Sequence, residues 1–375
     1  MISKDEFVAA IDLGTSKIVT IIGKKDREGK LEILAVSKTG SNGIKRGIIQ
    51  NIEETADAVR QTIEEFRENT GFKIDEVYVG ISGGNVSCFK NRGFINLNST
   101  INVIERQDLE KLTIDMHKIL MDAGREIIEI FPQNYTVEDV AGIRNPVGMS
   151  GKFLEGHFIT VTGESDSINN VYKCMKHAGL IVKKIIPEPV ASAEAVLTDS
   201  ERDSGIILVD IGAETTNLAF YKNGVVQNVA MIPFGGNQIT QDIKEHLFSG
   251  WDEAENIKIG YDETQYNLTT DHKNKLTSII LARMEEILSC VNFEIEKSGF
   301  KSKLHSGMVI TGGGALLKNL PQLIKSRTGL NVRVGYPAKV KIKFSNHHLN
   351  HPAYSSSFGL LIKGYEYNFS GTFKS

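Results

Sequence analysis

The chain has 375 residues, 41% hydrophobic and 24% charged, which is typical of a soluble globular protein and long enough to predict two domains. The formal net charge of −3 argues against electrostatic binding to nucleic acid. Three widely spaced cysteines (Cys88, Cys174 and Cys290) argue against a disulfide framework or a zinc site. With no signal peptide and no apolar run near the roughly 18–20 residues of a membrane span, we expect a cytoplasmic chain.

Strands and helices alternate along the predicted chain. Runs rich in Val and Ile predict strands at 7–11, 17–22, 31–36, 77–81, 158–162, 206–210, 218–221 and 308–311. Apolar residues at helical spacing predict a helix from Ile52 to Gly71, one before Gly179, one before Gly299 and one over residues 317–324. This alternation predicts an α/β architecture.

The sequence also contains an internal repeat. DLGTS at 12–16 matches DIGAETT at 210–216, and each copy lies between apolar strands. Two copies predict two duplicated lobes, each with an inserted smaller subdomain where the sequence does not repeat. The expected parts are a first lobe of 1–81 and 162–200 to which 358–375 return, an insertion at 82–161, a second lobe of 201–236 and 306–357, and an insertion at 237–305.

The two repeated turns have the composition of a phosphate site. A tight turn of Gly, Thr and Ser presents backbone N–H groups and hydroxyls that bind phosphate, and an Asp just before it can hold Mg²⁺ through waters. We therefore expect Asp12 and Asp210 on either side of one magnesium–phosphate group, with Lys17 nearby. The other predicted cradle residues are Gly14, Thr15, Ser16, Gly212, Thr215, Thr216 and Asn217. The alternative is that Asp-x-Gly serves only the backbone of a turn, which fits one hairpin better than two in register.

Further candidates follow other strands. Gly312, Gly313 and Gly314 join a strand to a predicted helix, where backbone can approach a ring or a phosphate closely. Gly235 and Gly236 end a strand in IPFGG, and Glu188 ends another in IIPEPVASAEAVL, before an Ala-rich helix.

These motifs, in this order, resemble the actin/Hsp70/sugar-kinase ATPase superfamily. Within it, the chain resembles the FtsA family of actin-like bacterial cell-division proteins. The segments that carry this second resemblance lie outside the shared motifs: GIKRGIIQNIEETADAVRQTI, VYVGISGGNVSCFKNRGFI and NPVGMSGKFLEGHFITVTG. The resemblance implies an actin-like fold of four subdomains, with ATP and Mg²⁺ between the two larger ones. It also implies that the Asp12 and Asp210 loops hold the Mg–phosphate group and that the 312–314 glycines approach the adenosine.

The resemblance further implies a role and partners. FtsA-like proteins polymerise on the inner face of the cell membrane at the division site, tether FtsZ filaments and meet other division proteins. They bind the C-terminal tail of FtsZ on the second insertion. This dock maps onto HKNKLTSIILARMEEIL, with Lys275, Arg283 and Glu286 as the expected contact residues. The alternative is that Arg283 and Glu286, spaced i,i+3, form only an intrahelical ion pair.

Two departures from the family pattern affect the expected activity. Glu214 adds negative charge near the phosphates unless it points to solvent, and Asn217 replaces a carboxylate. Glu188 has the position from which related enzymes orient the attacking water, although it could equally be a helix-start carboxylate. We therefore expect nucleotide binding and, at most, a slow Mg-dependent ATPase.

The end of the chain also departs from the family. One short helix is expected around 358–365, and no basic amphipathic membrane helix follows it, so the anchor either lies outside this sequence or is supplied elsewhere. Two other functions stay open from the sequence. One is a pilus-assembly adaptor of the same family, and the other is a small-molecule kinase of the same superfamily.

Overall fold

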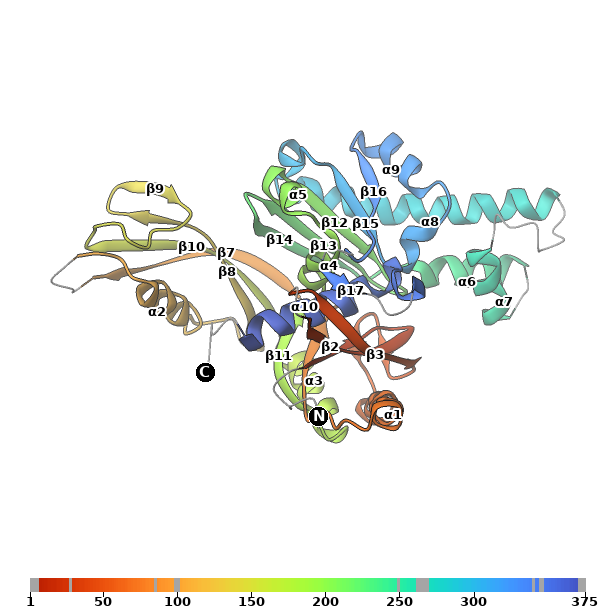
Figure 1. Cartoon of the computed structure of the whole chain (residues 1–375). Helices are drawn as coiled ribbons and strands as arrows, with labels where there is room; N and C mark the ends of the chain where they lie inside the picture. Colours follow the sequence, from red (N-terminus) through yellow and green to blue (C-terminus); the bar gives the residue numbers. More distant parts are fainter. Residues whose placement is uncertain are drawn as a thin grey trace.

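The computed structural model describes residues 7–26, 29–83, 86–97, 102–247, 250–260, 270–338, 341–343 and 347–369, the side chains of 270–272 and 347 excepted. Residues 370–375, expected to return to the first lobe, lie outside this range. Figure 1 shows two lobes with a small β-rich subdomain projecting at one end and a long helix at the other.

The first lobe is built on a six-stranded sheet of order β11-β6-β1-β2-β3-β17. Its strands are β1 (Val8–Leu13), β2 (Lys17–Lys25), β3 (Leu31–Gly40), β6 (Glu76–Ile81), β11 (Ile181–Pro187) and β17 (Ile342–Lys343). β1, β2 and β3 form an antiparallel meander, whereas β6 and β11 run parallel to β1. Between β3 and α1 the chain forms a small ladder of β4 (Ile44–Lys45) and β5 (Ile48–Ile49).

Helices cover both faces of this sheet (Figure 1). Those on one side are α1 (Ile52–Thr70) and α3 (Ser165–His177), and those on the other are α4 (Glu188–Val196) and α10 (Ser355–Phe369). The predicted limits of α1 are confirmed. Asn51 caps its start by accepting hydrogen bonds from the N–H groups of Glu53 and Glu54, and Gly71 ends it with φ 73°.

The second lobe repeats this topology. Its five-stranded sheet has the order β14-β13-β12-β15-β16, which corresponds strand by strand to β3-β2-β1-β6-β11. The strands are β12 (Ile206–Ile211), β13 (Thr216–Lys222), β14 (Val225–Ile232), β15 (Met308–Thr311) and β16 (Val332–Val334). The registers also agree, because Asp12 pairs with Val19 as Asp210 pairs with Asn217. The predicted α/β fold of two duplicated lobes is confirmed.

Both faces of the second sheet are buried. Ile207 and Val209 pack into a core with the helices of this lobe, whereas Ile206 and Leu208 point the other way and join the core of the first lobe. The helices of the second lobe are α5 (Asp199–Ser204), α6 (Gly236–Leu247), α7 (Trp251–Ile259), α8 (Thr270–Lys297) and α9 (Leu320–Thr328).

One predicted helix begins later than expected. Gly313–Leu316 form a 3-10 turn, and α9 starts only at Leu320. Asn319 adopts a left-handed conformation with φ 60°, which separates the two elements, and Pro321 then lies in the first turn of α9. Gly313 and Gly314 therefore belong to a 3-10 turn that follows Gly312, and no α-helix begins at the glycines.

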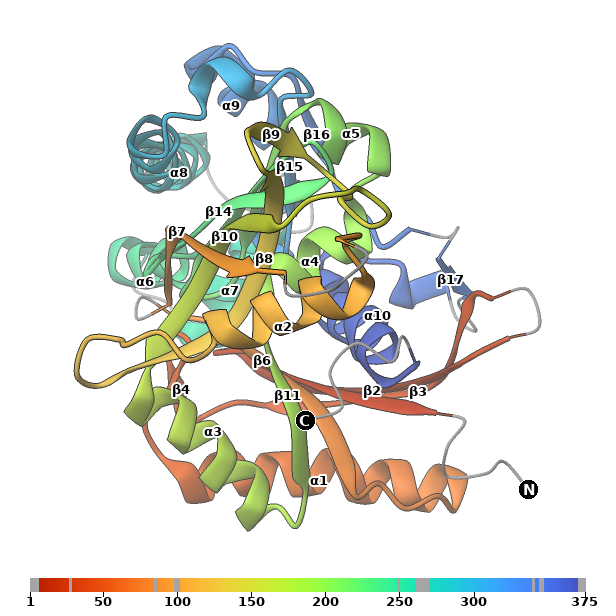
Figure 2. The same ribbon diagram turned by 90° about the vertical axis from the view of Figure 1, so that its left-hand side faces the viewer.

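The projecting subdomain has its own sheet and core. The sheet has the order β7-β10-β8-β9, from β7 (Ser87–Asn96), β8 (Arg125–Val137), β9 (Val140–Ile143) and β10 (Phe153–Glu164). α2 (Arg106–Met116) crosses one face of it (Figure 2), where Leu112 and Met116 are buried with Leu154 and Phe158. In the part of the chain that the structure describes, no helix combines the length and hydropathy that a membrane crossing requires.

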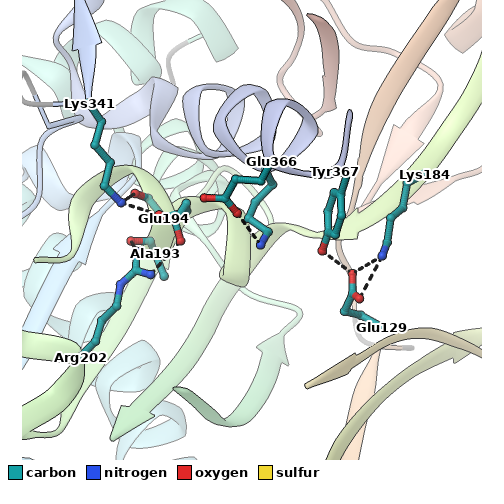
Figure 3. A network of polar contacts seen from close by, with 9 residues as sticks. Glu129, Lys184, Ala193, Glu194, Arg202, Lys341, Glu366 and Tyr367 are labelled. Carbon is teal, nitrogen blue, oxygen red and sulfur yellow. Dashed lines mark hydrogen bonds and ion pairs between the residues drawn. The ribbon is translucent and has the colours of Figure 1, made fainter. Parts of the chain in front are cut away.

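Polar contacts attach this subdomain to both lobes. Glu129 of β8 accepts from Lys184 of β11 at 2.9 Å and from the Tyr367 hydroxyl of α10 at 2.6 Å (Figure 3). On the other side, Gln227 of the second lobe donates to Gln133 of β8 at 2.6 Å, and the Cys88 thiol of β7 donates to Asn228 at 2.9 Å.

A second polar network joins α4 to the second lobe (Figure 3). Arg202 of α5 donates to Glu194 at 2.7 Å and to the carbonyl of Ala193, and Lys341 also pairs with Glu194. Burial by itself raises the pKa of the Glu194 carboxyl, but Arg202 and Lys341 outweigh it and lower the pKa to about 2.

Candidate functional site

A cleft of about 1050 Å³ opens between the two lobes. Both predicted hairpins line it, and Asp12 and Asp210 face this common space. The residues that contribute are Asp12, Gly14, Thr15, Ser16 and Lys17 from the first turn, Asp210, Gly212, Thr215 and Asn217 from the second, and Glu188, Gly236, Gly312, Gly313 and Gly314. Residues nearly two hundred positions apart are therefore brought into one site by the duplicated topology.

Two predicted site residues lie behind the cleft wall. Thr216 is fully buried and donates to the carbonyl of Phe234 at 2.8 Å, and the N–H of Gly235 donates to Gln238 at 2.9 Å. Neither lines the cleft. Thr216 and Asn217 are neighbours in β13, and successive residues of a strand point to opposite faces, so only Asn217 reaches the site.

Glycine is required by close contacts at two positions of the site. A Cβ on Gly14 would lie 2.6 Å from the carbonyl oxygen of Lys17, inside the first turn. Gly312 has φ 83°, and a Cβ there would collide with the Asp210 carboxylate and with the Ile211 carbonyl. The Asp210 side chain therefore has room only because residue 312, which is distant in sequence but follows the neighbouring strand β15, is a glycine.

The carboxylates of the cleft are buried, and their charges affect one another. Asp12, Asp210 and Glu188 are each less than a tenth exposed. Burial raises the pKa of Asp210 to about 6, and the charge of Asp12 adds to this against the effects of Ser192 and Lys17. Burial, and then the charges of Asp12 and Asp210, raise the pKa of Glu188 well above its usual range.

The geometry around Glu188 leaves one oxygen free. Asn217 donates to Glu188 Oε2 at 3.2 Å, and Ser82 in turn donates to Asn217 at 3.0 Å. Glu188 Oε1 is buried without a hydrogen-bond partner among the described residues. A buried acceptor without a partner, beside two further carboxylates, fits a site that takes up a cation and its waters.

Lys17 supplies positive charge at the same place. Its ammonium donates to the carbonyl of Ala353 at 2.9 Å and lies 4.3 Å from the centre of the Tyr354 ring. Burial lowers the pKa of Lys17, against the opposing effect of Asp12. The site thus combines turn amides, one half-buried lysine and carboxylates, which is a donor set that fits a magnesium–phosphate group.

Glu214, the unusual acid of the second turn, does not point to solvent. Its carboxylate accepts from the backbone N–H of Arg46 at 2.7 Å and from the Asn237 amide at 3.4 Å. Arg46 belongs to the segment between β4 and β5 of the first lobe, with φ 50°. Glu214 therefore forms a hydrogen bond across the cleft between the lobes.

Sequence reasoning missed several residues of the cleft. Trp251, Ile259 and Leu316 give it an apolar side, and all three are partly exposed there. Lys258 of α7 lies beside them, held by Glu255 at 2.7 Å and by Thr240 at 2.9 Å. The sequence contains little signal for them, because apolar residues on an amphipathic helix normally indicate its core face.

The residues expected to bind a partner lie on α8. Lys275 is exposed near its start, and Glu286 is exposed further along. Arg283 is half-buried and engaged on both sides: its Nε and Nη2 donate to Asp242 of α6 at 2.5 and 3.0 Å, and its Nη1 donates to Glu286 at 2.6 Å. The intrahelical pair that the spacing allowed is thus present, together with a two-pronged contact to α6 that the sequence did not indicate.

The fold and the cleft define an actin-like ATPase architecture. Two solved structures share it at low sequence identity, which shows the fold alone. The PilM–PilN type IV pilus biogenesis complex matches with a TM-score of 0.70 and 16% identity over 95% of this chain and 98% of that one. MreB5 of Spiroplasma citri bound to ADP matches with a TM-score of 0.56 and 13% identity over 98% of this chain and 99% of that one.

Sequence comparison identifies the family. The family profile "Cell division protein FtsA" matches residues 207–359, and "SHS2 domain inserted in FTSA" matches residues 83–162. Cell division protein FtsA of Borreliella burgdorferi is 32% identical over 96% of this chain and 91% of its own length. That of Neisseria meningitidis is 30% identical over 96% and 91%. The chain belongs to the FtsA family of cell-division proteins.

Proposed function

We propose that this protein binds ATP with Mg²⁺ between its lobes, polymerises at the cytoplasmic membrane and tethers FtsZ filaments at the division site. The observation that carries the nucleotide site is the pair of hairpins that bring Asp12 and Asp210 to one cleft in the same register. The MreB5 structure with the same fold is described as bound to ADP.

We assign the parts of the nucleotide to three regions of the cleft. The turns at 12–17 and 210–217 suit the phosphates, and Asp12 and Asp210 would hold Mg²⁺ through its waters. The glycines at 312–314 and the apolar side formed by Trp251, Ile259 and Leu316 suit the adenosine. When bound, Mg²⁺ would neutralise charge on the phosphates, and the protein residues would orient the nucleotide.

We propose that hydrolysis of the bound nucleotide is at most slow. Glu188 lines the cleft where it could orient water, but burial and the charges of Asp12 and Asp210 raise its pKa well above its usual range. A raised pKa favours the protonated carboxyl, which donates a hydrogen bond and cannot accept a proton from water. This supports a binding protein that switches or assembles with nucleotide more than an efficient enzyme.

For the partner, we propose that the polar side of α8 around Lys275, Arg283 and Glu286 binds the C-terminal tail of FtsZ. Family membership supports a division partner over the pilus-assembly alternative. The small-molecule kinase alternative would require ATP turnover that depends on a second substrate, and the cleft carboxylate available for such chemistry is Glu188, whose pKa is raised well above its usual range.

Titration with a fluorescent ATP analogue and magnesium tests the nucleotide site. The unaltered protein should bind the analogue with Mg²⁺, and Asp210→Ala should weaken this binding strongly. Asp203→Ala is a matched control, because Asp203 is exposed and pairs with Arg144 away from the cleft. Equal affinity of the Asp210→Ala and unaltered proteins would contradict the assignment. Electron microscopy on lipid with ATP and magnesium then tests for filaments.

A further inference from the structure

Helices α4 and α10 each donate hydrogen bonds to one of the two aspartates of the cleft. α4 follows β11 of the first lobe, and its Ser192 hydroxyl donates to Oδ2 of Asp210 in the second lobe at 2.5 Å. α10 packs on β1 of the first lobe, and its Ser356 and Ser357 hydroxyls donate to Oδ2 of Asp12 in that strand at 2.5 and 2.7 Å. Each aspartate is thus held by one of these two helices.

These contacts are buried and are made by side chains of two closely packed helices. Ser192 and Ser357 are fully buried, and both aspartates are less than a tenth exposed. The helices meet at Gly359, where a Cβ would collide with the carbonyl oxygen of Ala191, so their backbones touch. A serine inside a helix commonly donates to a carbonyl of its own preceding turn. Here the hydroxyls donate instead to carboxylates on other elements.

The hydrogen bonds leave each aspartate in a fixed orientation with acceptor capacity to spare. Both serines of α10 use the same oxygen of Asp12, and no hydrogen bond to its Oδ1 is found among the described residues. A hydroxyl that donates to a carboxylate makes a charge-assisted bond, which is stronger than a neutral one. A carboxylate oriented before its ligand arrives loses less conformational freedom on binding.

We propose that Ser192, Ser356 and Ser357 are positioning residues that orient Asp12 and Asp210 toward the hydrated magnesium of a bound nucleotide. The proposal rests on the nucleotide function proposed above and assigns it three residues outside the phosphate turns. It implies that these serines increase the affinity for nucleotide bound with magnesium, and change the affinity for nucleotide bound without magnesium very little.

The test measures affinity for a fluorescent ATP analogue with magnesium and with EDTA, in Ser192→Ala and in the double variant Ser356→Ala/Ser357→Ala. Loss of a hydrogen bond to a charged group corresponds to roughly a 10- to 100-fold change. We expect a loss of about this size in magnesium and a change below about 2-fold in EDTA. Ser356→Thr, which keeps a hydroxyl at a partly exposed position, should restore most of the affinity that Ser356→Ala alone loses.

Ser355→Ala is the matched control, because Ser355 is equally buried but bonds to Thr311 at 2.6 Å and not to Asp12. Thermal unfolding of each variant without ligand separates folding defects from binding. The proposal is overturned if the serine variants lose affinity equally with magnesium and with EDTA, or if Ser355→Ala reproduces their behaviour. An unaltered protein that binds no nucleotide overturns the proposed function, whereas normal binding with unaffected serine variants overturns only the positioning role.

Discussion

Asp210 is buried beside another carboxylate, so we expect the affinity of the proposed site for magnesium and nucleotide to depend on pH. Its pKa is raised to about 6. A cation binds the charged carboxylate, so protons compete with magnesium once the pH falls to this value. The pKa of Asp210 therefore predicts the pH below which the proposed site loses its affinity for magnesium.

We expect affinity for the magnesium–ATP analogue to be constant above about pH 7 and to fall steeply below pH 6. Calorimetry or fluorescence titration between pH 5 and 8 measures this directly. In Asp210→Asn the affinity should be low throughout, with a much flatter profile. A profile of the unaltered protein that is flat to pH 5 would show that Asp210 does not contact the bound group through its magnesium.

A second prediction concerns Gly312 and the stability of the fold. Gly312→Ala places a Cβ at φ 83° and ψ 173° against the Asp210 carboxylate, a backbone conformation that costs a non-glycine residue roughly 1–3 kcal/mol. We expect a lower free energy of unfolding in denaturant titration and weaker nucleotide binding. Gly313→Ala is the control, since a Cβ there has nothing within 4 Å. Similar stability for both variants would mean that the strand end adjusts without strain.

Among the elements, α8 carries the proposed partner site and is tied to α6 through Arg283 and Asp242. Arg283→Glu places like charges beside Asp242 and Glu286, so we expect binding to a peptide of the FtsZ C-terminal tail to be abolished. Fluorescence anisotropy with the labelled peptide measures this. Arg327→Glu is a matched control, because Arg327 is also a surface arginine paired with α8, through Glu285, but lies on α9. Normal peptide affinity in Arg283→Glu would move the dock elsewhere.

α4 supplies a stability prediction through Glu194. Its folded pKa of about 2 lies below the ordinary value of 4.5, so the carboxylate stabilises the fold above pH 4.5. That contribution, on the order of 3 kcal/mol, is lost as the pH falls from about 5 toward 2. Glu194→Gln should therefore be markedly less stable at pH 7, with a gap that narrows in acid.

Denaturant titration at pH 7, 5 and 4 measures the gap between Glu194→Gln and the unaltered protein. Glu68→Gln serves as the comparison, because Glu68 is an exposed carboxylate of α1 and should change stability little at any of these pH values. A constant gap for Glu194→Gln across the range would contradict the ion-pair origin of the stabilisation.

For the whole molecule, the inserted β7–β10 subdomain has contacts to both lobes. Glu129 holds it to the first lobe, and Gln133 and Cys88 hold it to the second. Its core is separate from those of the lobes. A change in the angle between the lobes must therefore either break one of these contacts or move the subdomain.

Glu129→Ala should release Lys184 and the end of α10 without unfolding the subdomain. We expect faster hydrogen exchange in β11 and around Tyr367, and unchanged exchange in α2, whose buried residues belong to the separate core. Mass spectrometry of peptides from both regions measures this. Gln133→Ala should leave the α10 region protected. Faster exchange throughout the subdomain would instead show that its core depends on the Glu129 contact.

The local pattern of the sequence determined the fold class, the two repeated hairpins and the limits of α1, because periodicity, caps and turn residues act over short stretches. Asp12, Asp210 and Glu188 could be selected for the same reason, as each stands at the end of an apolar strand. The tertiary structure decided what depends on pairing between distant segments. It brought Trp251 to the cleft and placed Ser192 and Ser357 within hydrogen-bond distance of Asp210 and Asp12. No spacing within one segment specifies such contacts, since they arise only when two separately formed lobes pack against each other.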